Sequence, residues 1–261
     1  MNRHVIAIAT IGILVSSPSL SAGRVMEVDE HIIGAQDQLI RAVNRWDVEE
    51  MLAARGGFER LLDRGGRDWL IRYYIGLADY RIAVYYMQET ESEKMDPYLE
   101  DAEQHLSQSI DEEPDFSDSF ALLAAILSLK IARNPISGIW IGPRIGGIME
   151  EAKKLNPENP RMWLIEGTSA YYRPKMFGGG IDAAKAALRN SIACFSSEEI
   201  ADQALPSWGA SEAFAWLGAI EMENGELDSA RVHFGRALAV NPSNGWVEFG
   251  LMPRLNELSG Q

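Results

Sequence analysis

Side chains able to act as nucleophiles, bases or metal ligands are sparse in this chain of 261 residues. Cys194 is the single cysteine, and one cysteine can form neither an internal disulfide nor a multi-thiolate metal site. His31, His105 and His233 lie too far apart for the two-histidine helix motif of zinc peptidases, and no nucleophile motif flanks them. We therefore predict no catalytic residue, no metal site and no cofactor. Carboxylates distant in sequence can pair for glycoside hydrolysis, which leaves an enzyme as an alternative.

A glycine run precedes a predicted helix over 181–195, and glycine backbones before a helix can hold an anion. The residues of such an anion-binding turn are Lys175, Gly178, Gly179 and Gly180. No phosphate-loop motif follows the run, and no strand precedes it. The sequence therefore favours a tight turn that lets Phe177 pack in the core, with anion binding as the alternative.

The charge of the chain argues against nucleic acid as a partner. There are 24 basic and 38 acidic residues, which gives a formal net charge of −14. Such a surface repels phosphate backbones. Twelve carboxylates and one base, Lys94, lie within residues 89–118, without the spacing of a calcium-binding loop. We interpret this stretch as a solvated face, and a patch for a basic partner is the alternative.

The N-terminus has the pattern of an export signal. Val5 to Val15 is an apolar run of 11 residues, too short to span a bilayer, and small residues follow it as far as Ala22. We predict a signal peptide over 1–22, cleaved after Ser21 or Ala22; a buried first helix is the alternative. Glycine stands at position 23, where a lipoprotein would carry its lipidated cysteine. We therefore expect an exported protein, periplasmic or secreted, that is not a lipoprotein and does not insert in the membrane after cleavage.

Hydrophobic periodicity predicts an all-α protein. Apolar residues recur every three or four positions in most segments, for example over 69–86 and 120–132, whereas the alternation typical of strands is nearly absent. Glycine and proline pairs separate the predicted helices. The segment 134–147 is rich in glycine and proline, and we expect it to be an enlarged loop between two helices.

Residues 211–244 form a repeat unit of small and large residues at fixed spacing. Its marker positions are Phe214, Leu217, Gly218, Gly225, Ala230, Phe234, Ala237 and Pro242. This unit resembles a tetratricopeptide repeat, a 34-residue pair of antiparallel helices. The resemblance implies that Gly218 and Ala230 are small because the two helices touch there. Glu221 departs from the pattern, which usually has tyrosine at that position.

The same pattern fits three upstream units more loosely, over 69–114, 117–157 and 160–196. Short phrases also resemble an exported bacterial subset of tetratricopeptide proteins. These phrases are Asn159-Pro160-Arg161, Pro174 to Gly180 and Trp208-Gly209. The resemblance implies a right-handed solenoid over 67–244. Residues 23–66 would form an N-terminal helical pair, either a degenerate repeat or a cap, and 245–261 a capping helix.

In a tetratricopeptide stack the first helix of each pair lines the concave face, so the resemblance also implies where a partner would bind. The residues expected on this groove are Tyr73, Leu77, Tyr80, Arg81, Arg161, Tyr171, Tyr172 and Met222. Rigid tyrosines beside small residues suit an extended peptide. We therefore predict noncatalytic binding of a protein or peptide partner in an open groove. The alternative is a small hydrophobic solute in an enclosed pocket, as in periplasmic tetratricopeptide accessories of transporters. The oligomeric state is left open.

Overall fold

The computed structural model describes residues 18–62, Arg64 and 66–260, and in this part of the chain the regular structure is entirely helical. The eleven α-helices are α1 (Pro18–Arg45), α2 (Val48–Glu59), α3 (Asp68–Gln88), α4 (Asp96–Glu112), α5 (Ser117–Arg133), α6 (Gly138–Leu155), α7 (Pro160–Tyr172), α8 (Ile181–Ser197), α9 (Ala210–Glu223), α10 (Leu227–Val240) and α11 (Met252–Ser259). Short helical segments join them: η1 (Ser92–Met95), η2 (Pro135–Ser137), η3 (Lys175–Phe177) and the π-helical η4 (Trp246–Leu251). The all-α class predicted from the sequence is confirmed.

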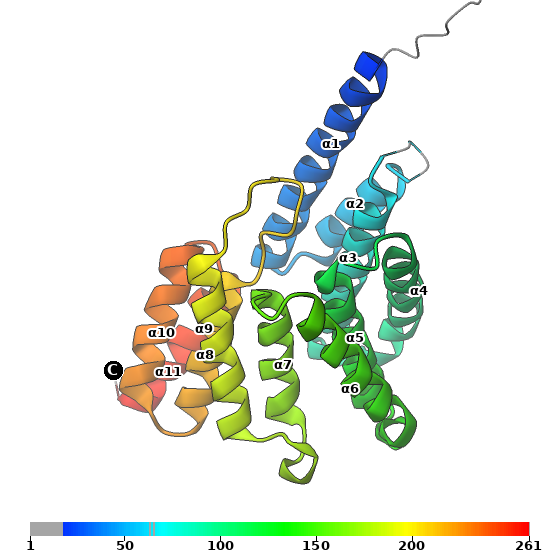
Figure 1. The fold of residues 1–261 in the computed structure, drawn as a ribbon. Coiled ribbons are helices and arrows are strands. Elements are labelled where there is room, and N and C mark those ends of the chain that lie inside the picture. Colours follow the sequence, from blue (N-terminus) through cyan, green and yellow to red (C-terminus); the bar gives the residue numbers. More distant parts are fainter. Residues whose placement is uncertain (1–17, 63, 65, 261) are drawn as a thin grey trace, which may run out of the picture.

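Consecutive helices pack as antiparallel pairs, which follow one another along the molecule (Figure 1). The first helices of successive pairs, α3, α5, α7 and α9, also contact one another in sequence order. The pair α1–α2 packs on α3, and η4 with α11 packs on α10 at the other end. None of the described helices is both long enough and apolar enough to cross a membrane.

The repeat spacing has a direct structural reason. A Cβ atom added to Gly218 on α9 would lie 2.7 Å from the ring of Phe234 on α10, and Ala230 is fully buried beside it. An approach this short leaves no room for a side chain larger than that of glycine. The equivalent contacts join Gly76 to Leu106 and Gly167 to Leu188, each with the same 2.7 Å approach. The small residues therefore mark the helix–helix contacts, as the repeat pattern implied.

Junctions between repeats use a recurring serine–asparagine pair. The Ser211 hydroxyl donates to the carbonyl of Ala237 (2.9 Å), and Asn244 Nδ2 donates to Ser211 Oγ (2.8 Å). At an earlier junction, the same two bonds join Ser117 to Ala152 (2.8 Å) and Asn159 to Ser117 (3.0 Å). These bonds pair buried polar groups. They also explain why the phrases NPEN and NPSN recur where second helices end.

The loop expected over 134–147 is wrong, because α6 begins at Gly138 and contains Pro143. Pro143 is the sixth residue of α6, beyond the first four residues whose N–H groups lack a helical partner, so it removes one hydrogen bond from the helix. Of the predicted signal peptide, residues 1–17 lie outside the described part of the chain. Its remaining residues form the first turn of α1, which projects beyond the helix pairs (Figure 1).

Candidate functional site

A long connection between α8 and α9 crosses the face formed by the first helices. We call residues 198–209 the strap; they leave the end of α8 and reach toward α1 and α3 (Figure 1). The Tyr74 hydroxyl donates to the carbonyl of Ala204 (2.8 Å), and Gln36 Nε2 donates to the carbonyl of Leu205 (3.2 Å). Buried side chains of α1 and α3 therefore hold the strap by its backbone.

Trp208 anchors the end of the strap. Its indole Nε1 donates to the Tyr73 hydroxyl (2.8 Å), and the Arg81 guanidinium stacks 4.8 Å from the centre of the indole. Tyr73 is fully buried, and burial strongly raises the pKa of its phenol, so it stays neutral. The expectation that Tyr73 faces an open groove is corrected, because the strap covers it.

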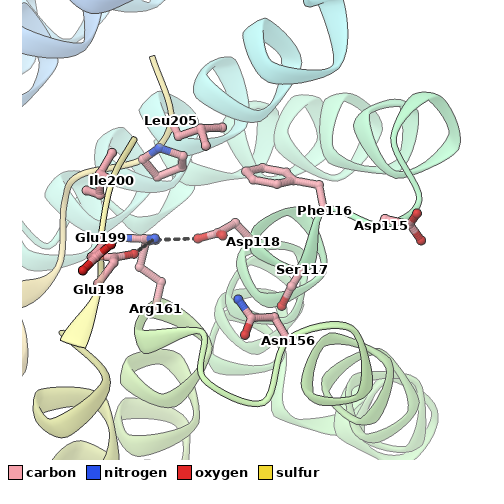
Figure 2. Close-up of a pocket in the computed structure, with 11 residues that line it drawn as sticks. Asp115, Phe116, Ser117, Asp118, Asn156, Arg161, Glu198, Glu199, Ile200 and Leu205 are labelled. Atoms are coloured by element: carbon pink, nitrogen blue, oxygen red, sulfur yellow. Dashed lines mark hydrogen bonds and ion pairs between the residues drawn. The ribbon is translucent and has the colours of Figure 1, made fainter. Parts of the chain in front are cut away.

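Arg161 also holds the strap. Its guanidinium pairs with Asp118 on α5 and with Glu198 at the start of the strap, as Figure 2 shows. These groups border a cavity of about 280 Å³ whose other walls include Ile200 and Asp115. The expectation that Arg161 would donate to a partner is also corrected, since its charge is already paired within the chain.

The larger cleft lies at the other end of the strap and has a volume of about 970 Å³. One wall is the C-terminal half of α1, with Leu39, Ile40 and Val43. The floor comes from α3, and the opposite wall combines the end of the strap, the start of α9 and residues 240–250. Asn241 Nδ2 donates to Asn44 Oδ1 (2.9 Å), so segments from the two ends of the chain meet at this cleft.

Six aromatic side chains line the cleft: Trp46, Tyr80, Trp208, Trp216, Trp246 and Phe249. They include four of the seven tryptophans in the sequence. The rings of Trp216 and Trp246 pack 5.1 Å apart between centroids. Large rigid rings give contact area at low entropic cost, which is a property of ligand-binding surfaces.

A partly buried ion pair crosses the cleft floor. Arg81 on α3 donates two hydrogen bonds to the Glu212 carboxylate on α9, at 2.9 and 2.6 Å. Burial alone would lower the pKa of Arg81, but Glu212 raises it above the usual value. Burial raises the pKa of Tyr80, which keeps its phenol neutral. Within the described lining the charges balance, since the remaining two are Arg45 and Glu248.

Apart from Tyr73 and Arg161, which hold the strap, the residues expected on the groove divide into three groups. Leu77, Tyr80 and Arg81 line the cleft. Tyr171 and Tyr172, at the end of α7, lie beside its margin, with ring centroids 6.4 and 6.3 Å from that of Trp216. Met222 is buried in a separate core cluster between α9, α10 and η4, and that placement corrects its expected exposure to a groove.

Several cleft residues are missed by the sequence prediction, namely those on α1, those in the segment 240–250, and Trp208 and Trp216. Nothing in the spacing of the sequence indicates that Asn44 and Asn241 meet, because 197 residues separate them. The Trp208-Gly209 phrase has no place in the repeat pattern, and it is the one local signal that could have pointed to the site.

The glycine run is a closed turn. The N–H groups of Gly178, Gly179 and Gly180 all donate to carbonyls within the turn or on α7. A Cβ at Gly179 would lie 2.0 Å from the carbonyl oxygen of Arg173, so the backbone requires glycine there. None of the three amides is free to bind an anion. The expectation that Phe177 packs in the core is wrong, because it is 65% exposed.

Within the described part of the chain, no group of three or more histidine, cysteine or acidic side chains is placed so that it could hold a metal ion.

Similarity to known structures fits this architecture. The chain is similar to the HusA haemophore from Porphyromonas gingivalis, with 24% identity, a TM-score of 0.61, and coverage of 76% of this chain and 94% of that one. It is also similar to a thermophilic TPR protein from Thermus thermophilus, with 16% identity, a TM-score of 0.54, and coverage of 87% and 100%. No family model and no curated protein sequence matches the chain. The protein therefore has a tetratricopeptide-repeat-like fold.

Proposed function

We propose that this protein binds a small apolar ligand, without catalysis, in the cleft between α1, α3, α9 and residues 240–250. The single observation that carries the proposal is the aromatic lining of a cleft of about 970 Å³. That volume lies near the upper end of the range for small-molecule sites, about 300–1,000 Å³. The strap and the Asn44–Asn241 contact bound the cleft at two sides.

The strap is the reason why we propose a small ligand and not a peptide. An extended peptide in a repeat groove would lie against the first helices, where Tyr73, Tyr74 and Arg161 now hold residues 198–209. Binding there would require the strap to leave and its buried partners to lose their hydrogen bonds, which is costly. The remaining cleft has the volume of a small-molecule site.

The similarity to HusA supports ligand binding by this fold, since that protein is described as a haemophore. The proposal takes from it the fold and not the ligand. Histidine, cysteine and methionine, three of the side chains that ligate haem iron, do not occur among the described residues that line the cleft, and burial raises the pKa of Tyr80, which disfavours the phenolate that would bind iron. We also propose that the protein is exported, periplasmic or secreted, where it would pass its ligand to a transporter.

Binding of N-phenylnaphthylamine, an uncharged fluorescent probe, tests the proposal. Val84 lines the cleft, so Val84→Trp should fill part of it and weaken binding at least about tenfold by steric overlap. Val232 is 55% exposed on α10 away from the cleft, and Val232→Trp is the matched control. Equal affinity of the two variants would contradict binding in the cleft.

A further inference from the structure

We infer that the ligand of the cleft is an uncharged, ring-bearing apolar molecule, of the size of a polycyclic terpenoid or a quinone. This inference rests on the proposed function and adds the chemical class of the ligand. Two independent features carry it, the pairing of the charges on the cleft floor and the arrangement of the rings.

The two charges on the cleft floor are paired with each other, and of the other charged lining residues Arg45 is exposed to solvent and pairs with Glu50 outside the lining. Arg81 uses two donors on Glu212, and its face covers the rings of Tyr80 (5.5 Å) and Trp208 (4.8 Å). A ligand anion could reach Arg81 only by displacing Glu212, which would leave a partly buried carboxylate without its partner. Breaking such a pair is strongly unfavourable. A cationic ligand could pair with Glu212 only by displacing Arg81, which is unfavourable for the same reason. A neutral ligand leaves the pair intact.

The rings favour a ligand that itself has rings. Arg81 occupies the faces of Tyr80 and Trp208, so the aromatic surface left for a ligand is that of Trp46, Trp216, Trp246 and Phe249. Phe249 is 75% exposed, so its ring is open to a ligand. Ile40 and Val43 on α1 add aliphatic surface to the same cleft. Aromatic pairs gain energy beyond buried area when rings stack offset or edge to face.

A matched pair of probes tests the inference. N-phenylnaphthylamine is uncharged, and anilinonaphthalene sulfonate has the same ring skeleton with one anionic group. Only the binding that Val84→Trp removes is counted, so that other apolar surfaces do not contribute. We expect the wild-type cleft to bind the uncharged probe at least about tenfold more tightly than the sulfonate, because a sulfonate placed on the cleft floor must break the Arg81–Glu212 pair.

The variant Glu212→Gln tests whether the Arg81–Glu212 pair causes this selectivity. It keeps the shape of the side chain and removes the negative charge that pairs with Arg81. This variant should strengthen sulfonate binding at least about fivefold and leave the uncharged probe unchanged within about twofold. Asp228 is exposed on α10, and Asp228→Asn alters the net charge of the protein equally, so it controls for general repulsion. It should change neither affinity.

The outcomes separate the two proposals. Sulfonate binding as tight as that of the uncharged probe in wild type overturns the inference and leaves the proposed function standing. Equal strengthening by Glu212→Gln and Asp228→Asn also overturns it, because the paired charge would then not set the selectivity. If neither probe binds in a way that Val84→Trp removes, the proposed function itself is wrong. The comparison of the two probes on the wild-type protein tests the inference even if Glu212→Gln fails to fold.

Discussion

Trp208 Nε1 donates a hydrogen bond of 2.8 Å to the hydroxyl of Tyr73, although 135 residues separate them in sequence. Through this contact the strap occupies the face on which repeat proteins of this type present their first helices. The face is therefore used twice. One part binds a segment of the chain itself, and the part beyond Trp208 remains as the aromatic cleft.

The anchoring role of Trp208 predicts a graded effect of substitution. Trp208→Ala removes a large ring that is only 8% exposed and should lower the free energy of unfolding by about 3–5 kcal/mol. Trp208→Phe keeps most of the packing but leaves the Tyr73 hydroxyl without this donor, at a cost of about 1–3 kcal/mol. Urea unfolding measures both. Two small and equal effects would show that the strap adds nothing to the stability of the fold.

The repeat register predicts a contrast between two positions on α10. Ala230 is fully buried against α9, so Ala230→Leu should destabilise the protein by about 1–3 kcal/mol through overpacking. Asp228 is exposed, and Asp228→Ala should change stability by no more than about 0.5 kcal/mol. Thermal unfolding of the two variants beside the wild type provides the comparison. Similar small losses at both positions would mean that the helix contact is placed wrongly.

Asp79 predicts a dependence of stability on pH. Burial raises the pKa of this carboxyl from 3.8 to about 7, although Arg55 pairs with it, and its Oδ2 has no hydrogen-bond partner among the described residues. Between these two values the native state binds a proton that the unfolded state has released. The contribution of Asp79 to the free energy of unfolding is therefore fully present below pH 3.8 and is lost as the pH rises through about 7.

Asp79→Asn isolates this effect, because the amide keeps the shape and does not titrate. Across the same pH interval the wild type should lose more than about 1 kcal/mol of stability relative to the variant, since one pKa unit corresponds to about 1.36 kcal/mol. Urea unfolding of both proteins at several pH values gives the difference, and contributions of other carboxylates cancel in it. A difference that does not vary with pH contradicts the raised pKa.

Export predicts the N-terminus of the mature protein. Cleavage after Ser21 or Ala22 would remove about the first turn of α1 and leave the rest of the helix in place. Fractionation of the native host should place the protein in the periplasmic or secreted pool, with Ala22 or Gly23 as its first residue. Recovery only with detergent would contradict the argument from glycine at position 23.

Much of the fold could be predicted from the sequence because its signals are local. The spacing of Gly218, Ala230 and Phe234 within one repeat reports a contact between neighbouring helices. The site could not be predicted in the same way. It depends on the strap folding back onto α3 and on Asn44 meeting Asn241, and both are contacts between distant segments without a repeating pattern. Tyrosines assigned by repeat position therefore included Tyr73, which is buried, and the same rule omitted Trp216 and Trp246.

The most direct test of the account is to identify what the protein carries when purified from its native host. Solvent extraction and mass spectrometry of the wild type should reveal an uncharged apolar molecule at about one per protein. The Val232→Trp variant should retain it, and the Val84→Trp variant should lose most of it, because Val84 lines the cleft and Val232 does not. The account is contradicted if the wild type carries no such molecule, if it carries a peptide instead, or if Val84→Trp retains the same amount.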